Sequence, residues 1–245
     1  MTAFTAHLRN ETRLLLREPA ALIFGALLPL AAIIVMTAIP AARNAVLDFG
    51  GRSVIELYQP TLVLFATSVL GLTIVPAILG GYRQLGVLRR LRTTPASPAG
   101  LLAALFVVVA AVGLIVTALL VLIPGLAGAG VPKDLGLFLL AGTLGLVAFL
   151  ALGTVLAAVV RSPQAAAGIG NLVAAIMWFS AGLWLPRVFF PDWLVTLTDL
   201  TPGGAATQAM LDAAAGAPAS WQPYVVLLAW TALGAGVAVR VFRWE

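Results

Sequence analysis

The sequence contains no cysteine, one histidine, one lysine and few charged side chains of any kind. The absence of cysteine excludes disulfide bonds, thiol catalysis and cysteine-ligated metal sites. Lys133 lies between Pro132 and Asp134, whereas a phosphate-binding P-loop requires its lysine after glycine and before serine or threonine. The chain therefore cannot bind ATP through a P-loop, and any nucleotide energy must be supplied by a separate chain.

Charged residues make up 9% of the 245 residues, 62% are hydrophobic, and the mean hydropathy is +1.08. Soluble domains usually carry about 25% charged residues. Six stretches free of charge are each long enough for a helix of about 20 residues, the length that crosses the bilayer core. The sequence therefore predicts an all-α, polytopic membrane protein with six transmembrane helices in a single domain, residues 1–245. We place the spans near residues 20–40, 60–81, 99–123, 135–160, 164–185 and 223–241.

The placement of arginine orients the six spans. Ten of the 14 basic residues fall in the two tails and in the connections after spans two and four: Arg9, Arg13, Arg17, Arg83, Arg89, Arg90, Arg92, Arg161, Arg240 and Arg243. The opposite side holds Arg43, Arg52, Lys133 and Arg187. Because basic residues concentrate on the cytoplasmic side, both termini are predicted to lie in the cytoplasm. The excess of basic over acidic residues then lies at the anionic membrane surface, and we do not expect nucleic acid as a partner.

Ionisable side chains are missing from the centres of the predicted spans. Transporters coupled to protons or ions usually place such side chains inside the membrane. His7 lies in the N-terminal tail, which leaves no base for a serine protease within the membrane, and no two spans carry the acids of an aspartyl protease. We predict no enzymatic activity and no metal or cofactor bound by this chain. A stand-alone transporter or channel driven by an ion gradient, for drugs or lipids, is the alternative function.

Residues 4–18 are the first of two segments that we predict to make contacts at the cytoplasmic face. Their apolar and basic side chains occupy different faces of a helix: Phe4, Leu8 and Leu15 on one, Arg9, Arg13 and Arg17 on the other. Such a helix lies in the membrane interface with its apolar side in lipid. Glu11 falls within the apolar arc and weakens the pattern, and a simple basic stop before span one is the alternative.

Residues 82–95 are the second segment. Its leucines share one face of the predicted helix and two of its arginines point away from them: Leu85, Leu88 and Leu91, against Arg83 and Arg90. Thr94-Pro95 ends this helix, and Ser97-Pro98 begins span three as N-cap and first helical residue. We expect a short amphipathic helix within the connection 82–98 that is rigid enough to transmit a push. A loop that only anchors the chain through its arginines is the alternative.

The segment 82–95 resembles the loop after span two in the membrane subunits of ABC-2 type exporters, which include the daunorubicin-resistance permeases of actinobacteria. In that family the loop reads Tyr-Arg-Glu, then Gly, a hydrophobic pair, basic residues, Leu and Thr-Thr-Pro. Gln84 stands where the family usually has Glu, so any salt bridge from that acid to the ATPase is in doubt here. Further matches cover almost the whole chain in order: Arg161-Ser162-Pro163-Gln164-Ala165-Ala166, residues 179–186, Pro191, Trp193-Leu194 and Leu200-Thr201-Pro202.

What the resemblance implies is half of an ATP-driven exporter in the inner membrane of a bacterial cell. Two such subunits, identical or different, pair with two copies of a separate ABC ATPase that binds the ATP and Mg²⁺. The contacts with the ATPase then involve Arg83, Gln84, Gly86, Leu88, Arg89, Arg90, Leu91, Arg92, Thr94, Arg161 and Ser162. The outer loop 186–222 forms short helices that cap the exit, with an ordinary interfacial loop as the alternative.

By the same resemblance, spans two and five line the substrate path near the dimer axis. Their polar candidates are Thr61, Thr67, Ser68, Thr73, Asn171 and Ser180, each of which alternatively bonds its own backbone or a neighbouring helix. A mostly apolar lining suits a lipid-like, amphiphilic or drug-type cargo, since a charged cargo would need a charged partner. Small residues four apart predict close helix packing: Gly113/Thr117, Ala141/Gly145, Ala166/Gly170 and Ala232/Gly236.

Overall fold

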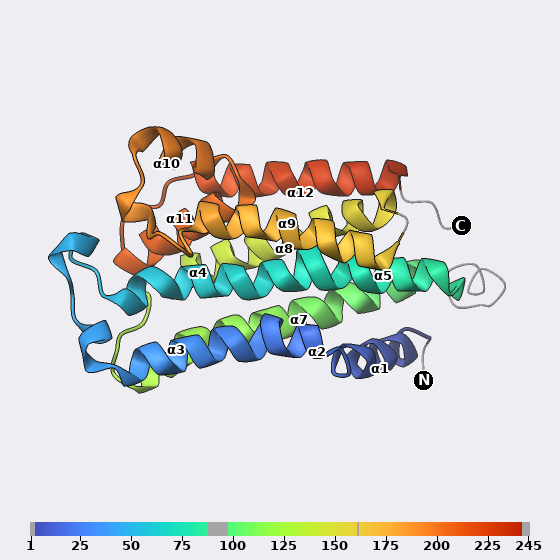
Figure 1. The fold of residues 1–245 in the computed structure, drawn as a ribbon, viewed down its shortest axis with the longest axis horizontal. Helices are drawn as coiled ribbons and strands as arrows, with labels where there is room; N and C mark the ends of the chain where they lie inside the picture. Colours follow the sequence, from blue (N-terminus) through green and yellow to red (C-terminus); the bar gives the residue numbers. More distant parts are fainter. Residues whose placement is uncertain (1–2, 88–97, 161, 242–245) are drawn as a thin grey trace.

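The computed structural model describes residues 3–87, 98–160 and 162–241, and its long elements are helices (Figure 1). Six helices among these residues are long and apolar enough to cross a membrane: Pro19–Ala38, Val54–Gln84, Ala99–Leu126, Leu135–Val159, Pro163–Ala181 and Gln222–Val241. They lie within a few residues of the six predicted spans, so the all-α fold and the number of spans are confirmed. Span two begins earlier than predicted because Ser53 and Glu56 form a reciprocal capping box at its start.

Two of the spans are built from several helical elements. Span one comprises α2 (Pro19–Leu22), the π-helical turn η1 (Ile23–Leu27) and α3 (Leu28–Ala38). Span two comprises α4 (Val54–Ser68), the π-helical turn η4 (Val69–Ile74) and α5 (Val75–Gln84). The other spans are α7 (Pro98–Leu126), α8 (Leu135–Val159), α9 (Pro163–Ala181) and α12 (Gln222–Val241). Outside the spans lie α1 (Ala3–Leu15), η2 (Pro40–Arg43), η3 (Leu47–Phe49), η5 (Arg187–Phe189), α10 (Asp192–Asp199) and α11 (Pro202–Ala215).

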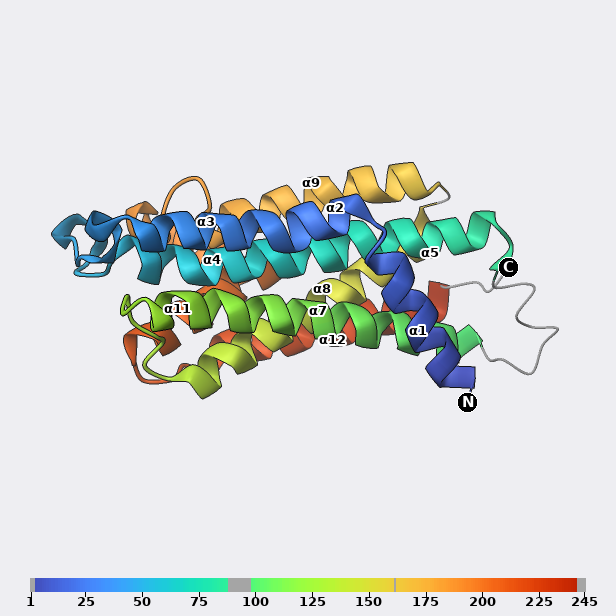
Figure 2. The same cartoon turned by 90° about the horizontal axis from the view of Figure 1, so that it is seen from below.

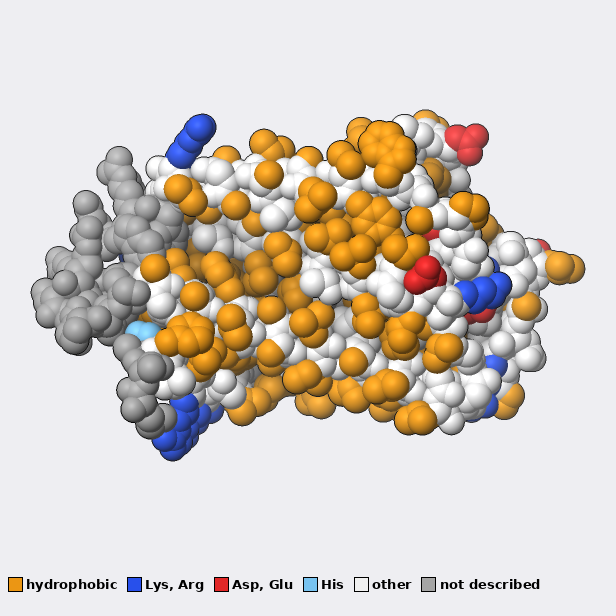
Figure 3. Space-filling view, turned by 180° about the vertical axis from the view of Figure 1, so that it is seen from behind, with side chains coloured by type: hydrophobic (Ala, Val, Ile, Leu, Met, Phe, Trp, Pro, Cys, Tyr) orange, Lys and Arg blue, Asp and Glu red, His pale blue; other side chains and the backbone are white. Residues whose placement is uncertain are grey.

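The spans run side by side along the long axis of the molecule, and both ends of the chain lie at the same end of the bundle (Figures 1 and 2). We call this the termini end; it also contains α1 and the turn between α8 and α9. The opposite end, with α10 and α11, is the loop end. Apolar side chains cover the flank of the bundle, and charged side chains gather at its two ends (Figure 3). Such a surface suits a protein whose flanks face lipid.

Span two forms the centre of the bundle, because most of it is buried whereas the other five spans are each less than half buried. The loop 186–222 between spans five and six contains the two short helices α10 and α11, as predicted. Helix α11 is buried along most of its length and packs against α4, α8, α9 and α12. It begins with Thr201, whose hydroxyl accepts a hydrogen bond of 3.0 Å from the Gly204 amide, followed by Pro202 in the first helical position.

Two glycines allow α8 and α9 to touch the backbone of span two at η4. A Cβ added at Gly153 in α8 would lie 1.9 Å from the carbonyl oxygen of Gly71. One added at Gly170 in α9 would lie 1.8 Å from the carbonyl oxygen of Leu72. Both neighbours are backbone atoms, which cannot rotate away as a flexible side chain can. Close packing at Gly170 is therefore confirmed, whereas the role of Gly153 was not predicted.

The other predicted packing pairs of small residues are also confirmed, whereas the pair on α12 is not. A Cβ at Gly113 would lie 2.9 Å from the Leu146 side chain, and one at Gly145 would lie 3.0 Å from Ala206. At Gly236, however, an added Cβ meets nothing within 4 Å. The prediction of Ala232/Gly236 as a packing pair is thus wrong in register. Gly234 makes the contact instead, at 2.9 Å from Ala151, because the buried face of α12 is rotated from the one that the sequence pattern suggested.

Replacing Gly170 by Ala is expected to destabilise the protein, because the new methyl group would overlap the Leu72 carbonyl. Overpacking of this kind costs about 1–3 kcal/mol. The control is Gly168→Ala on the same helix, where an added Cβ has no neighbour within 4 Å. Better helix propensity should leave that variant unchanged or stabilise it by up to about 1 kcal/mol. Thermal unfolding of detergent-purified protein measures both, and equal midpoints for the two variants would contradict the packing argument.

Candidate functional site

Arg83, a predicted ATPase contact, lies in the last turn of α5 and binds the end of α8. Its Nη2 donates to the carbonyl oxygens of Ala157 at 2.8 Å and Ala158 at 3.3 Å, and its Nη1 donates to that of Val160 at 3.4 Å. The last carbonyls of a helix have no partner within the helix and carry partial negative charge. A guanidinium is well suited to them. Arg83 therefore ties the end of span two to the end of span four.

The turn between α8 and α9 is packed against the same part of α5. Ser162 acts as N-cap of α9, with its Oγ accepting a hydrogen bond of 3.1 Å from the Ala165 amide. Pro163 follows in the first helical position, and its Cα would lie 3.0 Å from a Cβ added at Gly80. The two segments predicted as separate ATPase contacts, 82–95 and 161–164, are thus joined to one another through α5.

The predicted helix over 82–95 is corrected at its start. Helix α5 continues from span two as far as Gln84, whose side chain is exposed, and Gly86 then adopts φ +65°. A residue with that conformation interrupts an α-helix, so no continuous helix runs from Tyr82 to Pro95. The remaining predicted contacts lie outside the described residues: Leu88, Arg89, Arg90, Leu91, Arg92, Thr94 and Arg161. Their role stays a prediction.

Glu11 is the residue that the sequence pattern could not explain. It is only 1% exposed, and it accepts hydrogen bonds from Oη of Tyr82 at 2.6 Å and 2.7 Å. Burial raises the pKa of the Glu11 carboxyl, and the Tyr82 hydrogen bond and the neighbouring His7 partly oppose that rise. The buried face of α1, with Leu15, therefore packs against protein, mainly α7. This corrects the expectation that this face lies in lipid.

Three of the predicted path residues are enclosed within the bundle. Thr67 donates to the Val63 carbonyl at 2.8 Å, and Ser180 donates to the Ile176 carbonyl at 2.9 Å. Ser68 accepts a hydrogen bond of 2.7 Å from the indole Nε1 of Trp178. All three hydroxyls are buried and are used in packing, the alternative that their sequence positions left open.

Two further path residues, Thr73 and Asn171, meet on the surface of the bundle. Thr73 Oγ1 lies 2.8 Å from Oδ1 of Asn171, joining span two to span five. Around Asn171, exposed apolar side chains follow α9, including Ile169, Leu172 and Ile176. A polar pair exposed at membrane depth is unfavourable in lipid and is expected to face protein, water or cargo.

Arg187 is buried at the loop end, although the sequence indicated only a basic residue on that side. Its guanidinium donates to the Ser180 carbonyl and to Thr198 Oγ1, the latter at 3.1 Å, and forms an ion pair with Asp199. Burial lowers the pKa of Arg187 and raises that of Asp199, while each partner opposes the other's shift. The apolar run Val188-Phe189-Phe190 beside it is no signal of this burial, because Val188 and Phe189 are exposed and only Phe190 of the three is buried.

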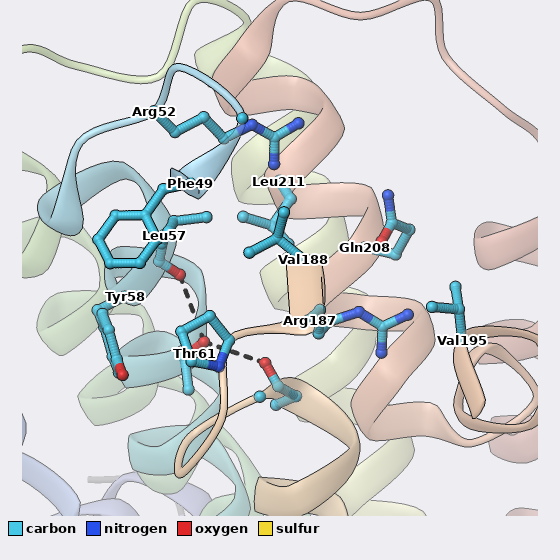
Figure 4. A pocket seen from close by; sticks show the side chains of 14 residues that line it. Phe49, Arg52, Leu57, Tyr58, Thr61, Arg187, Val188, Val195, Gln208 and Leu211 are labelled. Atoms are coloured by element: carbon cyan, nitrogen blue, oxygen red, sulfur yellow. Dashed lines mark hydrogen bonds between the residues drawn. The ribbon is translucent and has the colours of Figure 1, made fainter. Parts of the chain in front are cut away.

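A cavity of about 260 Å³ lies beside Arg187 at the loop end. Figure 4 shows its walls: the side chains of Phe49 and Arg52 from the first outer loop lie across from Val188, and Thr61 lies between them and the end of α9. Thr61 Oγ1 donates to the Ala181 carbonyl at 3.2 Å. The cavity is thus bounded by segments that span two and span five hold together.

Five apolar spans around a sixth, the mostly buried span two, with charge gathered at the two ends, define a multi-pass helical membrane protein. Among the described residues, no group of three His, Cys, Asp or Glu side chains is placed to hold a metal ion. The family model of the ABC-2 type transporter matches residues 2–214, and the chain therefore belongs to this family. It is a transmembrane permease, a non-catalytic subunit whose family implies an ATPase partner. No curated protein matches the chain.

Replacing Asp199 by Asn is expected to destabilise the loop end, because the buried guanidinium of Arg187 would lose its ion partner. Breaking a fully buried pair costs about 3–5 kcal/mol. Because Asp199 is partly exposed, we expect about 2 kcal/mol. Asp48→Asn, at an exposed position of the same end, is the control and should change stability by less than about 0.5 kcal/mol. Thermal unfolding in detergent compares the two, and a loss no greater than that of the control would show that the pair contributes nothing.

Proposed function

We propose that this chain is the membrane subunit of an exporter that moves a lipid-like, amphiphilic or drug-type substrate out of a bacterial cell. Two permease subunits, identical or different, would assemble with two copies of the ATPase, which binds ATP and Mg²⁺. The termini end would lie in the cytoplasm and meet the ATPase. This orientation is supported by the predominance of basic residues at that end.

The observation that carries the proposal is the connection between the two expected ATPase contacts. Arg83 bonds the end of α8, and Pro163 packs on Gly80. A displacement of the 85–97 connection is therefore passed to spans four and five as well as to span two. ATP can shift the balance between two conformations of the complex only by the difference between its binding free energies for them. A rigid junction lets that difference reach three spans together.

The substrate class is supported by the chemistry of the surface of spans two and five. Thr73 and Asn171 offer polar atoms there, and their described neighbours on α9 are apolar. An amphiphile presents both kinds of surface, whereas a charged cargo would require a charged partner. We therefore assign Thr73 and Asn171 to the path, and leave Thr67, Ser68 and Ser180 to packing.

Arg83→Gln is expected to weaken the coupling of ATP hydrolysis to transport, because the end of α8 loses its cation. With the co-expressed ATPase in proteoliposomes, the amount of fluorescent phospholipid or daunorubicin moved per ATP should fall several-fold. The cap itself contributes about 1 kcal/mol, so the protein should still fold. Arg43→Gln is the matched control: Arg43 also donates to carbonyls, those of Thr37 and Ala127, but at the loop end.

Two outcomes would overturn this proposal. If the permease failed to co-purify with the ATPase and moved the probes in response to an ion gradient alone, the alternative of a stand-alone transporter would hold. If Arg83→Gln and Arg43→Gln reduced transport per ATP equally, the junction at the termini end would have no special part in coupling.

The orientation can be tested directly because the chain has no native cysteine. Leu47→Cys lies on a loop-end turn and is 92% exposed in the wild type, and Gln84→Cys lies at an exposed position of the termini end. In intact cells, a membrane-impermeant maleimide should label the first variant and not the second. After the cells are opened, both should react. Labelling of Gln84→Cys in intact cells would reverse the proposed orientation.

A further inference from the structure

Helix α1 contacts the chain on both sides of the connection 85–97. On the entry side, the hydroxyl of Tyr82, three residues before Leu85, donates a bifurcated hydrogen bond to the two carboxylate oxygens of Glu11. On the exit side, α1 packs against α7, which begins at Pro98. A single short helix thus bridges the two ends of the segment that is expected to meet the ATPase.

The hydrogen bond to Glu11 is the specific part of this bridge. The carboxylate is almost fully enclosed, and a hydrogen bond to a charged group is about twice as strong as one between neutral groups. Removing the phenol would leave a buried charge without its donor, which costs more than the bond itself contributes. The apolar contacts of Leu8 and Leu15 on the same helix have no such requirement. Glu11 and Tyr82 therefore set the geometry with which α1 docks, and the leucines add buried apolar area.

Among the residues that the structure describes, few other titratable groups act on Glu11. Helix α7 carries none between Pro98 and Leu126, and α1 supplies His7 one turn away. The neighbour of Tyr82 on α5 is Arg83, whose guanidinium lies at the end of α8. The protonation state of Glu11 thus depends chiefly on its burial, on Tyr82 and on His7.

We propose that Glu11 is a positioning residue, which holds α1 against the end of α5 through Tyr82 and so fixes how the end of α5 and the start of α7, on either side of the connection 85–97, lie relative to one another. The inference rests on the proposed function for the identity of the partner. The docking of α1 is a property of the permease alone and can be measured without the ATPase.

The first test measures the distance between α1 and α5. Nitroxide labels on Asn10→Cys and Gln84→Cys, both exposed positions in the cysteine-free chain, report it by pulsed electron paramagnetic resonance. We expect one narrow distribution, to which Tyr82→Phe adds a population at longer distance. Glu11→Gln retains an acceptor and should keep the narrow distribution. Tyr224→Phe, on α12, is the matched control. A single unchanged distance in Tyr82→Phe would overturn the proposal.

The second test varies the pH of the same measurement. Because burial raises the pKa of Glu11, the docked state holds a proton to higher pH than the undocked state, so docking weakens as the pH rises through the raised pKa. Tyr82→Phe removes an interaction that lowers this pKa and should extend the effect to higher pH. Glu11→Gln should abolish it. If the role of Glu11 were purely structural, the profiles of docking against pH would be parallel in the wild type, Tyr82→Phe and Glu11→Gln.

The third test uses the complex with the ATPase. If α1 holds the end of α5 and the start of α7 in their resting arrangement, Tyr82→Phe should raise ATP hydrolysis without cargo by up to about tenfold, the shift expected when a hydrogen bond to a charged group is lost. Hydrolysis equal to the wild type, in a variant whose distances have changed, would overturn the positioning role. Absence of any ATPase partner for the wild type would instead refute the proposed function and leave the distance measurement intact.

Discussion

The contact of α8 and α9 with the backbone of span two at η4 is the constraint on which the rest of the bundle depends. In lipid, helices gain little from hydrophobic burial against each other, so association relies on close van der Waals packing and hydrogen bonds. Gly153 and Gly170 bring two helices within contact of the carbonyls of Gly71 and Leu72. The π-helical turn η4 lies where spans two, four and five meet. Such turns are frequent at functional sites. Spans four and five are thereby fixed to span two at mid-height.

From that contact span two remains joined to spans four and five at the termini end, and to span five toward the loop end. At the termini end Arg83 reaches the carbonyls that terminate α8, and Gly80 receives Pro163. Toward the loop end Thr61 bonds the Ala181 carbonyl, where α9 finishes. The other polar groups of the membrane region mostly bond a carbonyl of their own helix, as Thr67 and Ser180 do, since a group without a partner in hydrocarbon is costly. A polar pair left at the surface, Thr73 with Asn171, is for that reason informative.

The sequence was sufficient for what depends on local pattern. Charge-free length identified the six spans, and the Ser97-Pro98 pair identified the start of span three, where α7 begins at Pro98. It was insufficient wherever two distant segments meet. The sequence led us to predict Arg83 as a contact with the ATPase, because no residue near it in the sequence indicates that the end of α8 lies beside it. The clearest missed signal was Glu11: an acid within an apolar arc predicts a buried donor nearby, and Tyr82 is that donor.

The joints explain why coupling can work with so little chemistry in the chain. An ATPase that pushed on a flexible loop would lose the displacement in the loop itself, because each residue of a free loop has many accessible conformations. Here the connection after span two follows a helix whose end is bonded to α8, and the helices on both sides of the connection, α5 and α7, are in contact with α1. Under the proposed function, an ATPase that displaced the end of α5 would have to move spans two, four and five together or break the Glu11–Tyr82 bond. The first would transmit work to the membrane region, and the second would set a threshold for the ATPase to exceed.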